Sequence, residues 1–440
     1  MYSKNAVAPL PPMGWNSYDY YNTSVTEEDI RKNADYMSKN LKKFGWNHIV
    51  VDIQWSDPNA RFDPRFQYIP FTQFCIDEYS RQIPAPNRFP SSKDGKGFKP
   101  LADYVHSLGL KFGIHIMRGI PRIAAHNHLK IKGTDVTADM IADPYSISRW
   151  NGDMYGVIAD RKGAAEYYQS LFDLYAQWGV DYVKVDDICN TNMYPSNPYS
   201  AEKEIELIAN AIERCGRPMV LSLSPGPAVI EKAWHMEKYA NMWRITDDFW
   251  DNWKLLKAMF ERCEVWQRHV GEGSWPDCDM LPVGKLGKGF GKIRDTNFTE
   301  EEIKTMMSLW CIFRSPLMIG ADLPQLDEKT LGILTNKNVL DLLRLYHGAS
   351  QVMRDENQCI WVTYGNGCPA HNPPVVLGLF NLSDEDREVS VNLKNITGFV
   401  SEQTYGVRSL WDDEELFPVN GDAELFRRIP AHGAELLQFK

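Results

Sequence analysis

The chain has 440 residues and lacks the apolar segments that export or membrane insertion would require. Its N-terminal residues contain no apolar stretch of about 7–15 residues, which a signal peptide needs. No window approaches the roughly 20 consecutive apolar residues of a membrane span. We therefore expect a cytoplasmic protein without a membrane partner.

Basic runs are absent as well. The formal net charge is -10, so nucleic acid and anionic surfaces are not expected partners. The 8 cysteines are scattered and form neither Cys-x-x-Cys pairs nor a metal-binding spacing. In a reducing compartment we expect them to be free thiols. The composition leaves open whether the chain forms a homo-oligomer.

Residues 1 to about 325 alternate strand-like and helix-like segments. Short apolar runs typical of buried parallel strands lie at 47–52, 110–116, 180–186, 218–224 and 242–246. Amphipathic segments typical of helices lie between or after them, at 26–45, 163–179, 200–216 and 299–313. This alternation predicts βα units and a parallel sheet. The pattern by itself does not prove that the sheet closes into a barrel.

The pattern changes after about residue 340. Short strand-like runs separated by turn residues replace the helical periodicity, at 359–364, 374–382, 387–393 and 434–439. These runs predict a small antiparallel β-sandwich. We therefore expect two domains, a catalytic α/β domain at 1–340 and a sandwich at 341–440.

Two aspartates end two of the strand-like runs, Asp186 in YVKVDDIC and Asp248 in MWRITDDFW. Barrel enzymes place catalytic groups at the carboxyl ends of strands, and a pair of carboxylates can cleave a glycosidic bond. Alternation along a strand places Lys184 beside Asp186, where a cation lowers the pKa of a nucleophile. It also places Arg244 with Asp248, although a bulge would favour Asp247 instead. The alternative is that both are structural ion pairs.

Other candidates carry a weaker signal. Trp15 could wall a sugar pocket or fill the core. Asp52 in VVDIQW could accept hydrogen bonds from sugar hydroxyls or form a turn. Alternation cannot separate Asp277 from Asp279 in WPDCDML.

Histidines cluster in sequence after the third apolar run. His126 and His128, with His115 before them, are a weak metal signal, and a polar loop is the favoured interpretation. The role of this region stays open at this point.

Six motifs together resemble glycoside hydrolase family 27. They are MGWNS, VVDIQW, KVDD, WRITDD, WPDCDML and LWCIFRSPLMIGADL, which occur in the order and spacing of that family. The family contains α-galactosidases, α-N-acetylgalactosaminidases and β-L-arabinopyranosidases. The resemblance covers residues 10 to about 325. It implies a (β/α)₈ TIM barrel followed by a C-terminal antiparallel β-sandwich, and a retaining mechanism that uses neither a metal nor an organic cofactor.

The resemblance also implies roles for single residues. Asp186 matches the family's nucleophile, and Asp248 matches its acid/base. The positions that match sugar-binding residues are Trp15, Asp52, Lys184, Arg244 and Asp279.

One departure from the family bears on the substrate, a small-molecule or oligosaccharide glycoside. Many α-galactosidases carry two aspartates after the second strand, and here Ile53 takes the second place. β-L-Arabinopyranose is α-D-galactose without its CH₂OH group, so an apolar side chain removes a hydrogen-bond partner and fills the vacant space. We expect an exo-enzyme that releases terminal β-L-arabinopyranose, with weaker α-D-galactosidase activity. Strand alternation would turn Ile53 away from the centre, so its place in the pocket is implied by the resemblance alone.

A second departure keeps the alternatives open. Ser224 in LSLSPGP stands where many α-galactosidases have Glu, as in enzymes that accept N-acetylgalactosamine. Asp19 and Gln54 stand near the cysteines of the family's usual early disulfide, which agrees with a cytoplasmic enzyme. The alternatives are an α-galactosidase proper, an α-N-acetylgalactosaminidase and, from another class, an inactive carbohydrate-binding protein. Retention of both carboxylates disfavours the last.

Overall fold

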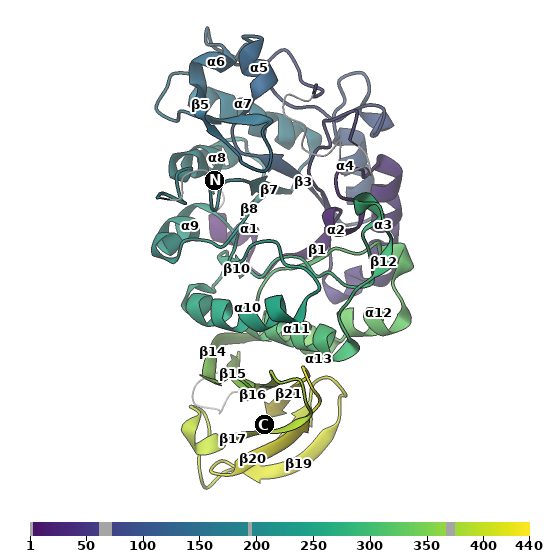
Figure 1. The fold of residues 1–440 in the computed structure, drawn as a ribbon, viewed down its shortest axis with the longest axis vertical. Helices are drawn as coiled ribbons and strands as arrows, with labels where there is room; N and C mark the ends of the chain where they lie inside the picture. The colour runs from purple at the N-terminus through teal and green to yellow at the C-terminus, as the bar shows by residue number, and fades with distance from the viewer. Residues whose placement is uncertain (1–2, 61–72, 192–195, 367–374) are drawn as a thin grey trace. The chain divides into compact units, whose positions relative to one another are not determined.

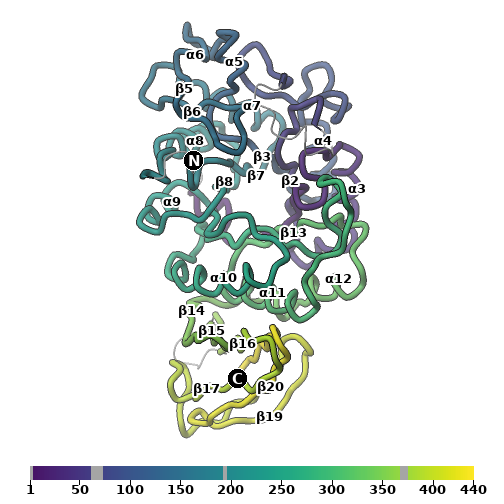
Figure 2. Tube along the Cα trace, in the orientation of Figure 1, coloured from purple at the N-terminus to yellow at the C-terminus, as the bar shows by residue number. Residues whose placement is uncertain are grey.

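The computed structural model describes residues 3–60, 73–191, 196–366 and 375–440. The chain divides into two compact units, which can be followed in Figure 2. The barrel unit comprises Met1–Asp248, Gly271–Asp295 and Leu317–Leu326, and the C-terminal unit comprises Phe249–Val270, Thr296–Pro316 and Asp327–Lys440. The division into domains at 1–340 and 341–440 stays a prediction.

The barrel unit is built on one parallel sheet. Eight of the described strands pair in the order β10-β9-β8-β7-β3-β2-β1-β13, and every neighbouring pair is parallel. In chain order the strands are β1 (Met13–Asn16), β2 (His48–Val51), β3 (Lys111–Met117), β7 (Tyr182–Asp186), β8 (Val220–Leu223), β9 (Met242–Arg244), β10 (Trp275–Asp277) and β13 (Leu317–Ile319). Figure 1 shows these strands curling around a common centre.

Backbone hydrogen bonds close the sheet into a barrel. Leu281, just after β10, forms a parallel bridge with Ile319 of β13. Leu281 N donates to Met318 O at 2.7 Å, and Gly320 N donates to Leu281 O at 3.0 Å. The two edge strands are thereby joined, and the predicted (β/α)₈ TIM barrel is confirmed.

Helices follow the strands along the chain, as the alternation predicts. They are α3 (Glu27–Asn40), α4 (Lys99–Ser107), α7 (Ala164–Trp178), α8 (Glu202–Arg214), α9 (Ala233–Tyr239), α10 (Trp253–Trp266), α11 (Glu300–Phe313) and α12 (Glu328–Leu334). Local sequence sets their ends. Thr26 and Thr299 begin α3 and α11 with reciprocal capping boxes, and Gly179 ends α7 in a left-handed conformation. Within the described residues no helix is long and apolar enough to cross a membrane.

The strands β1, β10 and β13 lie outside the five predicted strand runs. They have 4, 3 and 3 residues and are buried at every position. Segments this short and buried throughout show no alternation, so periodicity cannot reveal them. A small sheet of β4 (Ile120–Pro121), β6 (Met154–Val157) and β5 (Ala142–Ile147) was also not expected.

The strand-rich region of the C-terminal unit is antiparallel, as predicted. Within the described residues, six strands pair in the order β14-β15-β16-β21-β18-β19, and β17 pairs with β20. They are β14 (Tyr346–Arg354), β15 (Gln358–Gly365), β16 (Val375–Asn381), β17 (Arg387–Asn392), β18 (Thr404–Ser409), β19 (Glu415–Asn420), β20 (Glu424–Ile429) and β21 (Ala434–Phe439). Residue 374, the first of one predicted strand, lies outside the described residues.

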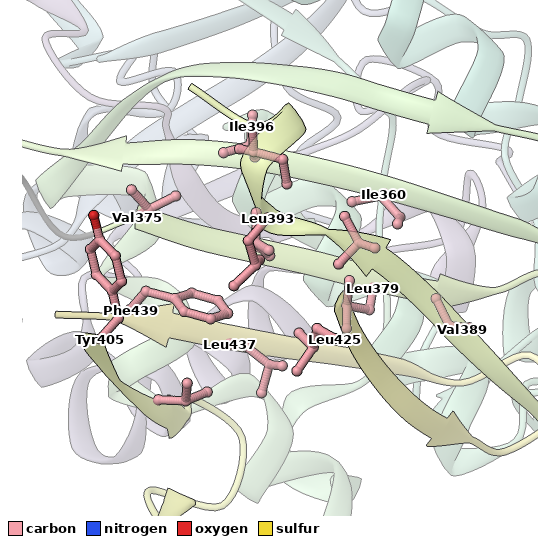
Figure 3. Close-up of a cluster of buried hydrophobic side chains, with 14 of the residues drawn as sticks. Ile360, Val375, Leu379, Val389, Leu393, Ile396, Tyr405, Leu425, Leu437 and Phe439 are labelled. Carbon is pink, nitrogen blue, oxygen red and sulfur yellow. The ribbon is translucent and has the colours of Figure 1, made fainter. Parts of the chain in front are cut away.

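A single apolar layer joins the two sheets of this region. Figure 3 shows Ile360 and Leu437 of the larger sheet facing the same layer as Val389 and Leu425 of the smaller one. Two sheets that share one core form a β-sandwich.

Gly14 gives a test of how tightly the barrel strands pack. A Cβ atom at Gly14 would lie 2.5 Å from His48 O and 2.6 Å from His48 Cβ on the paired strand. We expect Gly14→Ala to lower the free energy of unfolding by about 1–3 kcal/mol, measured by urea denaturation. Gly271→Ala is the matched control, because nothing lies within 4 Å of its Cβ position. An unchanged unfolding midpoint for Gly14→Ala would contradict this packing.

Candidate active site

Polar side chains gather at the carboxyl ends of the barrel strands. Asn16 ends β1, Asp52 directly follows β2, Asp186 ends β7, Arg244 ends β9 and Asp277 ends β10. Because all eight strands run in parallel, these ends meet at one face of the barrel. The barrel therefore brings together residues that the sequence scatters over more than half of the chain.

Asp186 is held by a histidine and a lysine. His115 Nε2, on the neighbouring strand β3, donates a hydrogen bond to Asp186 Oδ2 at 3.1 Å, and Lys184 Nζ lies 4.0 Å from the same oxygen. Burial raises the pKa of the Asp186 carboxyl, but the hydrogen bond from His115 and the charges of Lys184 and Arg244 outweigh it. The pKa therefore lies well below its usual range, and Asp186 is ionised across the physiological range.

Asp52 anchors Lys184 from the other side. Its Oδ2 lies 3.1 Å from Lys184 Nζ and accepts a hydrogen bond from Asn16 Nδ2 at 2.7 Å. Burial raises the pKa of Asp52. The charge of Lys184 and the hydrogen bonds from Asn16 and the Ile53 backbone lower this pKa by more than burial raises it, so the net shift is downward. Burial lowers the pKa of Lys184, and the charges of Asp52 and Asp186 more than reverse this. All three groups are therefore charged.

A second cluster of charged side chains is centred on Arg244. Its Nη2 atom lies 2.9 Å from Asp248 Oδ1 and 3.3 Å from Asp279 Oδ2. Arg244 is buried, whereas 63% of the Asp248 side chain is exposed. The strand β9 ends at Arg244, so this ion pair, and not strand alternation, places Asp248.

The structure distinguishes the surroundings of Asp277 from those of Asp279, a choice that strand alternation left open. Asp277 ends β10, and its Oδ1 accepts a hydrogen bond from Asp279 N at 2.9 Å. Burial and the charge of Asp279 raise the pKa of Asp277 to about 7. Asp279 has a left-handed backbone (φ 78°), and its carboxylate reaches Arg244. Of the two, Asp279 therefore belongs to the charged group around Arg244.

Trp15 and Ser224 are fully buried. The indole Nε1 of Trp15 donates to Ala321 O at 2.6 Å, and its ring packs edge-on against Tyr21. Ser224 bonds through its backbone to Val185 and Ile188, and its Oγ has no hydrogen-bond partner among the described residues. Their roles at a bound sugar stay predictions.

Ile53 does not follow the strand alternation. The strand β2 ends at Val51, and Ile53 lies in the turn that follows. It packs with Met117 and Met154, and the partly buried Tyr18 contacts the same cluster. The Tyr18 ring centre is 5.9 Å from Lys184 Nζ. Ile53 therefore belongs to an apolar cluster beside the charged site.

The sequence did not single out the groups that hold the residue after Asp186. The guanidinium of buried Arg118 donates to Asp187 O at 2.5 Å, and lies 3.0 Å from Asp187 Oδ2 and 3.1 Å from Glu204 Oε1. Asp187 has a left-handed backbone (φ 57°), which this clamp stabilises. The available signal was a charged residue, Arg118, directly after the apolar strand β3.

The three histidines lie in different surroundings. His115 contacts Asp186, while His128 is exposed and lies 3.0 Å from Asp139. Within the described ranges, no group of three or more His, Cys, Asp or Glu side chains is placed to hold a metal ion. The interpretation of the His126–His128 region as a polar loop stays a prediction.

Cysteine side chains occur in both compact units of the chain. Cys75, Cys189, Cys215, Cys311 and Cys359 are free thiols. Cys368 lies outside the described residues. The expectation that all 8 cysteines are free stays a prediction for the whole chain.

A solved structure decides the family. A β-L-arabinopyranosidase of Geobacillus stearothermophilus, described as a family 27 glycoside hydrolase in complex with arabinose, is 50% identical, with a TM-score of 0.93 over 99% of this chain and 98% of that chain. The chain belongs to glycoside hydrolase family 27. A family model described as Alpha galactosidase A also matches residues 149–344 of this family 27 enzyme.

Other relatives carry different names. A Bacillus halodurans protein described as a candidate α-N-acetylgalactosaminidase is 47% identical, with a TM-score of 0.86 over 98% of this chain and 97% of that chain. Alpha-galactosidase 3 of Arabidopsis thaliana is 27% identical over 98% of this chain and 82% of its own length. All three relatives are named as glycosidases, and their names give different substrates.

The contact between His115 and Asp186 predicts a change in pH dependence. His115→Phe removes the hydrogen bond that contributes most to lowering the Asp186 pKa, so that pKa should rise. The predicted nucleophilic role of Asp186 requires its ionised form, so the acid limb of kcat/KM should move to higher pH. The depressed pKa also stabilises the folded enzyme above the unfolded pKa of about 4, and this contribution disappears as the pH falls.

The matched control for this experiment is His106→Phe. His106 Nε2 lies 2.7 Å from Asp181 Oδ2, a carboxylate at the opposite end of β7. This variant should leave the acid limb in place. An acid limb that stays unchanged in His115→Phe would show that His115 does not control the ionisation of Asp186.

Proposed function

We propose that this enzyme is a retaining exo-glycosidase that releases terminal β-L-arabinopyranose, with weaker activity on α-D-galactosides. The observation that carries the proposal is the apolar cluster of Ile53, Met117 and Met154 beside the charged site. A pentopyranose presents a hydrogen atom where galactose presents CH₂OH, and an apolar wall suits the former. The family 27 relative solved with arabinose supports the same substrate class.

The two aspartates would share a double displacement. Asp186, ionised and buried, attacks the anomeric carbon and forms a glycosyl ester while the bond to the leaving oxygen breaks. Asp248 gives its proton to that oxygen. Water then attacks the anomeric carbon as Asp248 takes a proton from it, the bond from that carbon to the Asp186 carboxylate breaks, and the sugar leaves with retained configuration. The 63% exposure of the Asp248 side chain supports this division, since both the aglycone and water must reach it.

The remaining charged groups would bind the sugar hydroxyls. Asp52 and Asp279 offer carboxylate acceptors, and Lys184 offers a donor between Asp52 and Asp186. Arg244 orients Asp248 and Asp279 through its ion pairs. Charged partners make strong and specific hydrogen bonds to hydroxyl groups.

Single observations favour two other substrates. The Bacillus halodurans relative and Ser224 favour an N-acetylgalactosaminide, although Ser224 is fully buried. The plant relatives favour an α-galactoside. An inactive carbohydrate-binding protein is disfavoured because both aspartates and their cations are in place. A cytoplasmic location stays a prediction, and the oligomeric state stays open.

Replacing the nucleophile tests the mechanism. We expect Asp186→Ala to lower kcat by about 10⁴-fold or more, because no other group can form the glycosyl ester. Added azide should occupy the space of the carboxylate and yield a glycosyl azide of inverted configuration, identified by NMR. Near-normal turnover in Asp186→Ala would remove Asp186 from this role.

Asp247 and Asp248 form a matched pair for the acid/base. Both side chains are exposed. Of these two residues, Asp248 forms the ion pair with Arg244. Asp248→Ala should slow substrates with poor leaving groups far more than activated ones, whereas Asp247→Ala should retain the leaving-group dependence of the wild type. The reverse pattern would transfer the role to Asp247.

A panel of p-nitrophenyl β-L-arabinopyranoside, α-D-galactoside and α-N-acetylgalactosaminide tests the substrate. The arabinopyranoside should have the highest kcat/KM. Ile53→Asp should raise the galactoside-to-arabinopyranoside ratio by roughly 5- to 150-fold, since one hydrogen bond to a buried hydroxyl contributes about 1–3 kcal/mol. Ile53→Leu, which adds no polar group, should leave the ratio nearly unchanged. If the wild type prefers the galactoside, the substrate proposal is wrong and the glycosidase assignment stands.

A further inference from the structure

Gln54 is a buried amide with unmet hydrogen-bonding capacity. Its residue exposure is 6%, and neither Nε2 nor Oε1 has a hydrogen-bond partner among the described residues. Buried amides normally pair both their donor and their acceptor, because unpaired polar groups are costly. A side chain with both atoms free points to a ligand that can donate and accept at the same place.

The backbone holds Gln54 firmly in this position. Its φ of 63° lies in the left-handed region, which is unfavourable for a side chain of this size. Arg88 Nη1 donates to Gln54 O at 2.6 Å and to Asp57 O at 3.0 Å. The turn is therefore braced by a buried guanidinium, and the side chain cannot be explained as a loosely placed surface group.

The Gln54 side chain lines a small cavity, which we call the Gln54 cavity. Its volume is about 20 Å³, and its lining includes Ser56 and Asn151 as well as the apolar Ile53 and Met117. A cavity of this size holds one water-sized group. The polar part of the lining suits a hydroxyl oxygen.

The cavity lies directly behind the charged site. His115 lines it and also donates to Asp186, and Met117 is the register partner of Asp186 across β3 and β7. Ile53 is part of the lining, and its backbone N donates to Asp52 Oδ1 at 2.8 Å. The cavity therefore shares His115, Met117 and Ile53 with the surroundings of Asp186 and Asp52.

We propose that the Gln54 cavity is a hydroxyl-binding subsite that the Ile53 side chain closes off from the sugar site. The inference rests on the proposed function, because it assigns the wall beside Ile53 to the C5 position of the sugar. In the wild type, Ile53 blocks a hydroxymethyl group sterically. When that wall is absent, the Gln54 amide donates to and accepts from the hydroxyl of a hexopyranoside such as a galactoside.

Truncating Ile53 without adding a polar group tests this directly. Ile53→Ala removes Cγ1, Cγ2 and Cδ1 and opens the path to Gln54. We expect the galactoside-to-arabinopyranoside ratio of kcat/KM to rise by about 10-fold or more, in the range of one hydrogen bond to a hydroxyl. Adding Gln54→Leu to Ile53→Ala should remove most of that gain, because leucine has a similar size and no amide.

Two variants control for general loosening of the barrel. Ile49→Ala removes the same atoms from a fully buried isoleucine in β2 that does not line the cavity, so the ratio should not move. Ile53→Val opens less space and should shift the ratio in the same direction by a smaller factor. If thermal unfolding shows that Ile53→Ala does not fold, the ratio measured for Ile53→Val tests the subsite instead.

The outcomes separate this inference from the substrate proposal. A wild type that prefers galactoside overturns the substrate proposal, whatever the variants do. Unmoved ratios in both Ile53→Ala and Ile53→Val overturn the subsite. A gain in Ile53→Ala that persists in full with Gln54→Leu also overturns it, because space alone would then explain the effect. A gain that requires Gln54 supports it.

Discussion

A buried lysine between two carboxylates is the interaction on which the catalytic end of the barrel depends. Lys184 Nζ lies 3.1 Å from Asp52 and 4.0 Å from Asp186, and all three side chains are almost excluded from water. A buried charge is tolerated only when opposite charges and hydrogen bonds compensate for lost solvation. Three strands, β2, β3 and β7, contribute to this balance, with His115 completing it from β3. The pairing of these strands thus places the groups that keep Asp186 ionised.

A second buried cation, Arg244, also pairs with two carboxylates, but these two carboxylates differ in their exposure to solvent. Arg244 is as buried as Lys184, but its partner Asp248 faces solvent, while Asp279 does not. The two proposed catalytic carboxylates therefore experience different surroundings. Asp186 is desolvated and stabilised as an anion, as suits attack on carbon, and Asp248 remains open to the leaving group and to water. Proton transfer needs this accessibility, whereas nucleophilic attack needs a fixed position.

Specificity would reside in the turn after β2 and not in the charged groups. Asp52 belongs to the charge network, the next residue is apolar, and Gln54 is a buried amide on a braced, left-handed backbone. Asp52 thus faces the charge network, whereas the two residues after it both line the Gln54 cavity, which strand alternation would forbid. Because β2 ends at Val51, the turn geometry replaces alternation in deciding where Ile53 points.

The sequence by itself determined the alternation of most barrel strands and helices, the sandwich, and the pairing of Asp186 and Asp248 with cations, because periodicity and short spacings act locally along the chain. Only the tertiary structure decided the contacts of His115 and of Gln54. His115 lies 71 residues from Asp186, and the pairing of β3 with β7 makes them neighbours on adjacent strands. The strands β1 and β13, which complete the barrel, are too short for periodicity to reveal. Long-range pairing and turn geometry are properties of the closed barrel, so no local pattern could contain them.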